Sequence, residues 1–255
     1  KSRNTLSIDV EMVDATYLYV NPTITVRYNP ELTSLSAAAL NVKIQNALIS
    51  FEADKLGTFG NKFYLYELSE KLKDADSSFI SVDVDILLEK RFIPLTTEIS
   101  TYQINYYQKV FEPHAGHLGS LTSTSFTVDD TSALFLDHDG YGILRTYTVD
   151  SGSKNYRDNN FGTIDYDTGL ITLTNKLISA YDGDYLSLKI KPNGKNIFGQ
   201  RNQIILISGA TIETINDSTD ASTSSVGLVA TSGVSTTITT DNSTASSGST
   251  TSYSI

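Results

Sequence analysis

Apolar and polar residues alternate with a period of two along several segments of this sequence. This period places the apolar side chains on one face of a β-strand. Residues 6–13, 17–28 and 79–88 all show it, and we expect three half-buried strands there. Pro22 interrupts the second segment, and proline has no N–H to donate to a neighbouring strand. We therefore expect the first half of that segment to be an edge or a bulge.

The period changes between the second and third strand segments. Apolar residues then recur at spacings of four, four and three, which predicts one face of an α-helix. They are Leu40, Ile44, Leu48 and Phe51, with Val42 and Ile49 widening the stripe. Ser34 or Ser36 can cap this helix, and Gly57 can end it. A shorter helix is predicted near 64–74. With Pro94 closing the unit, residues 1–95 are predicted to form a β-β-α-α-β unit with its helices on a small sheet.

From residue 97 onward no segment has helical periodicity, and short strands separated by turn signals take over. Strands are predicted near 102–106, 124–129, 133–137, 143–149, 162–166, 170–174, 185–191 and 203–207. Asp139-Gly140 and Asp167-Thr168-Gly169 each separate two such strands, a pattern typical of hairpins. Residues 96–210 are therefore predicted to form an antiparallel, sandwich-like β domain. The fold class expected for the whole chain is α+β.

After about residue 211 the composition shifts strongly toward serine and threonine. Such a segment buries little apolar surface by itself. It still contains strand-like stretches at 226–229, 234–240 and 253–255. For the tail, residues 211–255, we favour order against a neighbouring subunit over plain disorder.

The charge and composition argue against several classes of partner. The chain has 255 residues, no cysteine and a net charge of −10, which disfavours binding to nucleic acid phosphates. No apolar stretch reaches the ~18 residues of a membrane span. We therefore expect neither nucleic acid nor membrane as a partner. Because Lys1 is not methionine and no signal segment follows it, we expect further domains upstream.

Two groups of residues have partial metal-site patterns. Asp137-His138-Asp139-Gly140 is similar to the start of a calcium loop, but threonine stands at position 148, where such a loop needs a bidentate glutamate. A hairpin turn is the favoured interpretation. His114 and His117 have ligand-like spacing, but the chain has only one further histidine, and a zinc site needs three or four ligands. An exposed loop is favoured there.

No catalytic arrangement emerges from the sequence. The glycine pairs at 57–60 and 116–119 lack the context of a phosphate-binding loop. No nucleophile elbow or zinc-protease helix motif is present. We assign no catalytic, cofactor-binding or metal residues, and we expect no enzyme and no cofactor. Tyr102, Tyr106 and Tyr107 form either an interface patch or part of a strand core.

Two stretches of the sequence together resemble a known family. The first comprises Val20-Asn-Pro-Thr-Ile-Thr-Val-Arg-Tyr28, the helix up to Ala53, Phe59-Gly-Asn-Lys-Phe63, Tyr66-Glu-Leu-Ser-Glu-Lys-Leu72 and Phe79-Ile-Ser-Val-Asp-Val-Asp85. The second comprises Phe161-Gly-Thr-Ile-Asp-Tyr-Asp-Thr-Gly-Leu-Ile-Thr-Leu173, Pro192-Asn193, Asn196-Ile197 and Arg201-Asn-Gln-Ile-Ile-Leu-Ile207. Over residues 1–215 the chain resembles the C-terminal part of the baseplate wedge subunit of contractile-tailed bacteriophages, in the J-like baseplate group.

The resemblance implies a structural virion protein of the viral tail, assembled in the host cytoplasm. Wedge subunits of this family pair as dimers and close into a ring around the central hub, and the ring widens on sheath contraction. The implied partners are other copies of the chain, other baseplate wedge proteins and hub proteins, and the family carries no catalytic residues.

Two alternatives stay open. A surface adhesin or carbohydrate-binding β module would fit the β-rich middle and the polar tail, but it seldom needs the predicted β-β-α-α-β start. An enzyme acting on polysaccharide would need a pair of carboxylates that the sequence does not single out.

Overall fold

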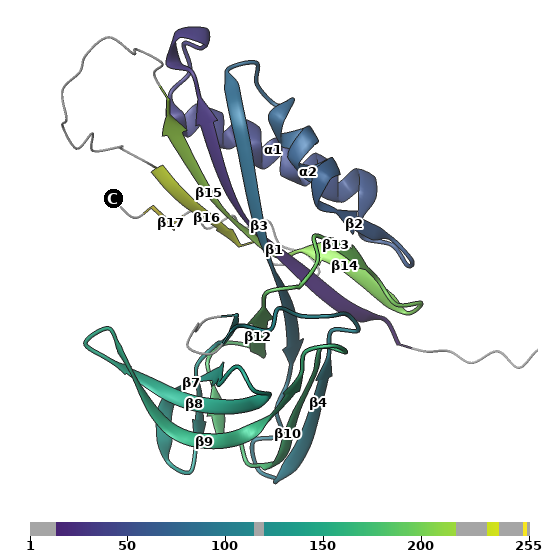
Figure 1. Ribbon diagram of the computed structural model, residues 1–255, viewed down its shortest axis with the longest axis vertical. Coiled ribbons are helices and arrows are strands. Elements are labelled where there is room, and N and C mark those ends of the chain that lie inside the picture. The colour runs from purple at the N-terminus through teal and green to yellow at the C-terminus, as the bar shows by residue number, and fades with distance from the viewer. Residues whose placement is uncertain (1–13, 115–119, 218–233, 240–251, 254–255) are drawn as a thin grey trace, which may run out of the picture.

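The computed structural model describes residues 14–114, 120–217, 234–239 and 252–253. The strand predicted at 6–13 lies outside this part of the chain. The fold is α+β and mostly strand, with two α-helices on one sheet and a second sheet that curls below it (Figure 1). The fold class expected from the sequence is thus confirmed at this level.

The first sheet has the strand order β17-β16-β15-β1-β3-β12-β5, and β14 also pairs with β1. Its strands are β1 (Thr16–Tyr28), β3 (Phe79–Phe92), β5 (Leu121–Ser123), β12 (Leu186–Ile190), β14 (Gln203–Ile207), β15 (Gly209–Asn216), β16 (Val234–Thr239) and β17 (Ser252–Tyr253). β1 runs antiparallel to β3 and parallel to β14 and β15. Strands from both ends of the described chain therefore meet in one sheet.

Pro22 lies inside β1, which continues through it with partners on both sides. On one side Pro22 is opposite Ile86 of β3. On the other side β14 pairs with β1 up to Val20, and β15 pairs from Thr23 onward. The missing N–H of Pro22 therefore falls where β1 changes neighbours. The expected edge is confined to residues 16–18, which pair with β14 alone because the pairing with β3 begins at Tyr19.

The helices cover one face of the first sheet (Figure 1). α1 (Ala37–Lys55) is capped by Ser36, whose hydroxyl accepts a hydrogen bond from the Ala39 N–H at 3.2 Å. α2 (Leu65–Lys73) confirms the second predicted helix. A 3₁₀ turn, η1 (Pro30–Leu32), precedes α1. Between the helices, β2 (Lys62–Tyr64) pairs with β13 (Asn196–Phe198), so the described order is β-α-β-α-β.

The predicted apolar stripe of α1 is only partly buried. Leu40, Ile44, Leu48 and Phe51 are buried, as predicted. Val42 and Ile49, predicted to widen the stripe, are instead 52% and 59% exposed, so that prediction was wrong. α1 thus has an apolar face toward the sheet and further apolar residues on its outer side.

The second sheet is antiparallel throughout, in the order β11-β6-β7-β8-β9-β10-β4. Its strands are β4 (Ser100–Asn105), β6 (Phe126–Val128), β7 (Thr131–His138), β8 (Ile143–Asp150), β9 (Ser153–Asp165), β10 (Leu170–Lys176) and β11 (Ala180–Tyr181). Both predicted hairpins are confirmed, by β7–β8 and by β9–β10. Gly140 and Gly169 provide the positive φ angles of these turns, +85° and +69°.

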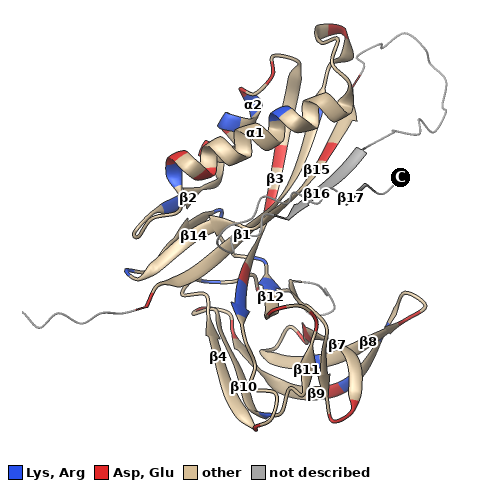
Figure 2. Ribbon diagram, turned by 180° about the vertical axis from the view of Figure 1, so that it is seen from behind, with Lys and Arg blue, Asp and Glu red and all other residues tan. Residues whose placement is uncertain are grey.

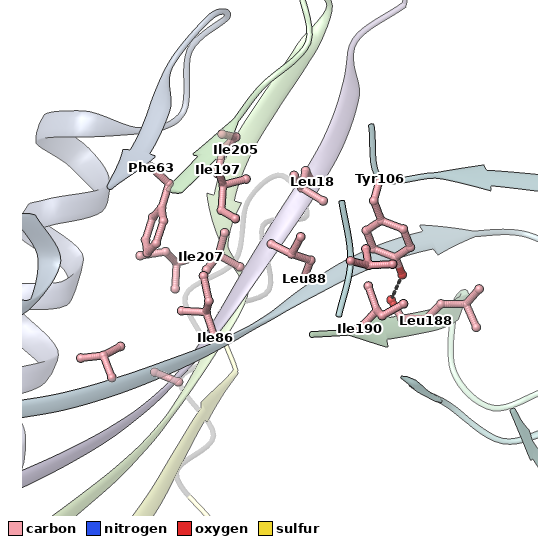
Figure 3. Packing of buried hydrophobic residues seen from close by; sticks show 14 of the residues in the cluster. Leu18, Phe63, Ile86, Leu88, Tyr106, Leu188, Ile190, Ile197, Ile205 and Ile207 are labelled. Atoms are coloured by element: carbon pink, nitrogen blue, oxygen red, sulfur yellow. Dashed lines mark hydrogen bonds between the residues drawn. The ribbon is translucent and has the colours of Figure 1, made fainter. Parts of the chain in front are cut away.

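The two sheets share one hydrophobic core. β3 pairs with β1 along its first part and with β12 along its last residues, so a single strand runs through both halves. Buried side chains continue across this junction, from Leu18 and Leu88 to Ile190 and Tyr106 (Figure 3). The Tyr106 hydroxyl donates a hydrogen bond to the Leu188 carbonyl at 2.6 Å. The halves are therefore packed against each other through the core.

Candidate assembly interface

One face of the first sheet is open in the described part of the chain. The helices pack over the face to which Leu18, Val20 and Ile24 contribute, and those residues are buried. The opposite face carries exposed polar side chains from neighbouring strands, among them Thr23 and its cross-strand partner Asp85. This polar, partly acidic surface is available to another protein.

The outer side of α1 offers a surface of different chemistry. The exposed residues Val42 and Ile49 are seven positions apart and so lie on one stripe of the helix. Ala38 and Ala53 extend that stripe and are also exposed. Most of α1 is drawn in tan in Figure 2, with charged residues mainly toward its C-terminal end. We consider these exposed apolar side chains a candidate contact surface for another protein.

A buried carboxylate lies on β3 near the junction between the two halves. The Glu89 side chain is 3% exposed. Its carboxylate accepts hydrogen bonds from Asn21 Nδ2 at 2.9 Å, from Ser208 Oγ at 3.0 Å and from Arg91 Nε at 2.6 Å. Because Ser208 connects β14 to β15, the cluster joins β1, β3 and this connection.

Charges around Glu89 decide its ionisation. Burial alone would raise the pKa of Glu89, but the guanidinium of Arg91, the Lys189 ammonium and the Asn21 amide together hold that pKa below its usual value. Arg91 in turn lies over the rings of Tyr19 and Tyr185, at 3.9 and 4.4 Å from their centroids. A cavity of about 260 Å³ opens beside this cluster. Lys189 of β12 lies 3.8 Å from the Glu89 carboxylate, so the cluster extends to the strand that pairs with the end of β3.

The residues of the calcium-like segment lie in three different environments. Asp137 is fully buried and accepts hydrogen bonds from Lys154 Nζ and the Tyr156 hydroxyl, both at 2.9 Å. Asp139 accepts from the N–H groups of Tyr141 and Ile143, which closes the hairpin turn. Among the described residues, no cluster of three or more His, Cys, Asp or Glu could hold a metal ion. The segment is the hairpin that the sequence favoured.

His138 forms a buried hydrogen-bonded chain that the sequence did not predict. Its Nε2 contacts the hydroxyl of Ser120, and its Nδ1 lies 2.8 Å from the Tyr166 hydroxyl. Burial lowers the pKa of His138, which favours the neutral ring. A serine beside a histidine is the geometry of an activated nucleophile. Here both residues are buried, with 6% and 2% exposure.

The other residues singled out from the sequence lie apart. His114 is exposed, and His117 is outside the described residues. The sequence left two interpretations for Tyr102, Tyr106 and Tyr107, an interface patch or part of a strand core. Tyr106 belongs to the core, Tyr102 packs on Phe92 with ring centroids 5.3 Å apart, and Tyr107 is 51% exposed. Sequence reasoning missed the Glu89 cluster, although Glu89, Lys90 and Arg91 are three consecutive charged residues within a strand.

These features together define a class of protein. An α+β chain with a buried junction, an open polar sheet face and exposed apolar residues on a helix offers several surfaces on which another protein can pack. Neither described helix is long and apolar enough to cross a membrane.

Comparison with protein families matches one part of the chain. Residues 16–91 match the model of the family described as baseplate structural protein gp6, C-terminal domain III. No curated protein matches the chain. The matched range runs from the start of β1 almost to the end of β3 and includes both helices. The predicted resemblance to the C-terminal part of a phage baseplate wedge subunit is thus confirmed for this range. The match supports a structural role in a phage baseplate, contacts with other baseplate proteins and a place in the virion tail.

Proposed function

We propose that this chain is a non-enzymatic structural subunit of the baseplate wedge in a contractile phage tail. It assembles in the host cytoplasm, pairs with a second copy of itself and joins other wedge proteins and hub proteins. The dimers close into a ring around the central hub, and this ring rearranges when the sheath contracts. The observation that carries the proposal is the match of residues 16–91 to the baseplate family.

The arrangement of the two halves supports this role. A closed ring requires each subunit to present its contact surfaces at a defined angle. The common core and the Glu89 cluster fix that angle within the subunit. Rearrangement of the ring would then change contacts between subunits rather than the fold of each one. The division into residues 1–95, 96–210 and a tail that contacts a neighbour at 211–255 stays part of the proposal.

The exposed apolar stripe of α1 is the surface that we assign to self-pairing. Two such helices from two copies can pack along Val42 and Ile49 and remove both side chains from water. Burying a side chain of this size contributes about 1.5–3 kcal/mol. The sheet-facing side of α1 is already filled, so this contact leaves the core of each copy unchanged.

Light scattering of the purified chain tests the self-pairing. The wild-type chain is expected to have the mass of a dimer, and Ile49→Glu is expected to have the mass of a monomer with an unchanged circular dichroism spectrum. Ile93→Glu is the matched control, because Ile93 is also exposed but lies beyond β3, away from α1. A wild-type chain that stays monomeric at high concentration would count against the dimer.

A further inference from the structure

A second groove opens where β1 and β4 meet the end of β3. It has a volume of about 370 Å³ and is lined by Tyr17, Tyr19, Lys90, Arg91, Asn105 and Tyr107, among others. β3 changes from acidic to basic as it enters this region, which Figure 2 shows as a change from red to blue. The groove therefore combines aromatic walls with two cationic side chains.

The two cations of the groove differ in their partners. Arg91 is already paired with the buried carboxylate of Glu89, at 2.6 Å. Lys90 is only 9% exposed, and in the described part of the chain no carboxylate lies within 4.0 Å of its ammonium group. Burial lowers the pKa of Lys90 to about 8. Lys90 lines the groove, and a largely desolvated cation without a counter-ion is unfavourable, so a carboxylate bound in the groove would lower that cost.

The aromatic walls are arranged for contact with another molecule. Tyr17 and Tyr107 are 45% and 51% exposed. Tyr107 has a φ of +56°, a left-handed conformation that is rare for a bulky residue. Its N–H donates to Asn105 Oδ1 at 2.7 Å, which holds this conformation in place. Such strained residues are concentrated at functional sites, and exposed tyrosines are enriched in protein interfaces.

We propose that this groove binds a segment of a different protein of the assembly and that Lys90 forms an ion pair with an aspartate or glutamate side chain of that segment. Lys90 is a single cation without a counter-ion, which suits a single carboxylate. A polyphosphate chain carries many negative charges, and a protein with a net charge of −10 would repel it. The self-pairing surface assigned above lies on α1, so the groove stays free for another protein. The inference rests on the proposed function, which supplies that neighbour.

The amine can first be probed in the isolated full-length chain. Acylation with sulfosuccinimidyl acetate, followed by peptide mass spectrometry, measures how fast each lysine reacts at different pH values. The rate at Lys90 is expected to rise with pH and to level off near pH 9, because burial lowers the pKa of Lys90 to about 8 and its amine is then mostly neutral, whatever its absolute rate. A rate at Lys90 that still rises steeply above pH 9 would indicate an ordinary solvated ammonium group and would overturn the proposal. Protection of Lys90 by inorganic phosphate alone would indicate a small-anion site and would also overturn it.

Zero-length cross-linking in purified tails then tests the partner. A carbodiimide joins an amine to a carboxylate in direct contact, so Lys90 is expected in an amide link to an aspartate or glutamate of another protein. Lys90→Met is expected to lower incorporation into tails at least tenfold without lowering the melting temperature, and Lys73→Met is expected to assemble as wild type. If the tails contain the chain but Lys90 stays unlinked, or links to a peptide of this same sequence, the inference is overturned. If the tails lack the chain, the proposed function itself fails.

Discussion

Replacing Glu89 by glutamine should weaken the junction between the two halves far more than the same change at an exposed site. The carboxylate accepts three hydrogen bonds, one of them from the guanidinium of Arg91, whose side chain is 14% exposed. Loss of a hydrogen bond to a charged group costs about 1.5–3 kcal/mol. Breaking a fully buried ion pair costs about 3–5 kcal/mol, and Arg91 keeps its contacts with two tyrosine rings. We expect Glu89→Gln to lower the free energy of unfolding by about 2–3 kcal/mol.

Asp85→Asn is the matched control for this substitution. Asp85 lies on the same strand and pairs with Lys191 at 2.7 Å, but its side chain is 61% exposed, and such pairs contribute at most about 1 kcal/mol. Urea unfolding at pH 7 measures both variants. Because the pKa of Glu89 is lowered in the folded state, its stabilising effect exists above the unfolded pKa and is lost as pH falls through the folded value. The deficit of Glu89→Gln should therefore shrink on acidification. Equal losses for the two variants at pH 7 would refute this account of the junction.

Three further predictions concern the core and the second sheet. Tyr106→Phe should lower the free energy of unfolding by about 1–3 kcal/mol, because the buried Leu188 carbonyl loses a hydrogen-bond donor. Urea unfolding of this variant should still show one transition, and two separate transitions would contradict the shared core. Gly169→Ala should lower the melting temperature more than Gly183→Ala. Both glycines have positive φ angles, but only at Gly169 would the new methyl group lie 2.5 Å from the Gln108 carbonyl oxygen. Equal shifts in melting temperature would contradict this. Asp137→Asn should destabilise the chain at pH 7 and progressively less at lower pH. Burial alone would raise the pKa of Asp137, but Lys154 and the neighbouring hydrogen-bond donors outweigh it and lower that pKa. A loss of unfolding free energy that grows on acidification, measured by urea unfolding, would refute this.

Local patterns in the sequence predicted most of the elements, because a strand or helix follows from the spacing of its own residues. The burial of Leu40 and Phe51 and the Asp139-Gly140 hairpin are examples. Strand partners were harder to predict, since pairing depends on residues far apart in the chain. Nothing local to β14 indicates that it runs parallel to β1.

The sites depend on the same long-range pairings. The Glu89 cluster brings Asn21 and Ser208 to the charged residues of β3, and no sequence spacing connects these three parts of the chain. The Lys90 groove likewise needs β1, β3 and β4 to converge. For Val42 and Ile49 the sequence predicted the helix correctly, but it did not predict that these two side chains would be exposed. Surfaces that serve contacts between proteins carry the same apolar residues as a core, so periodicity alone does not separate the two.

The central claim is that the chain is a structural part of a phage tail baseplate. Immunogold electron microscopy of tails, from a phage whose genome encodes this sequence, tests it most directly. Antibodies raised against the purified chain are expected to label the baseplate end of the tail, with mass spectrometry detecting the chain in the same particles. Particles that lack the chain, or label away from the baseplate, would contradict the account.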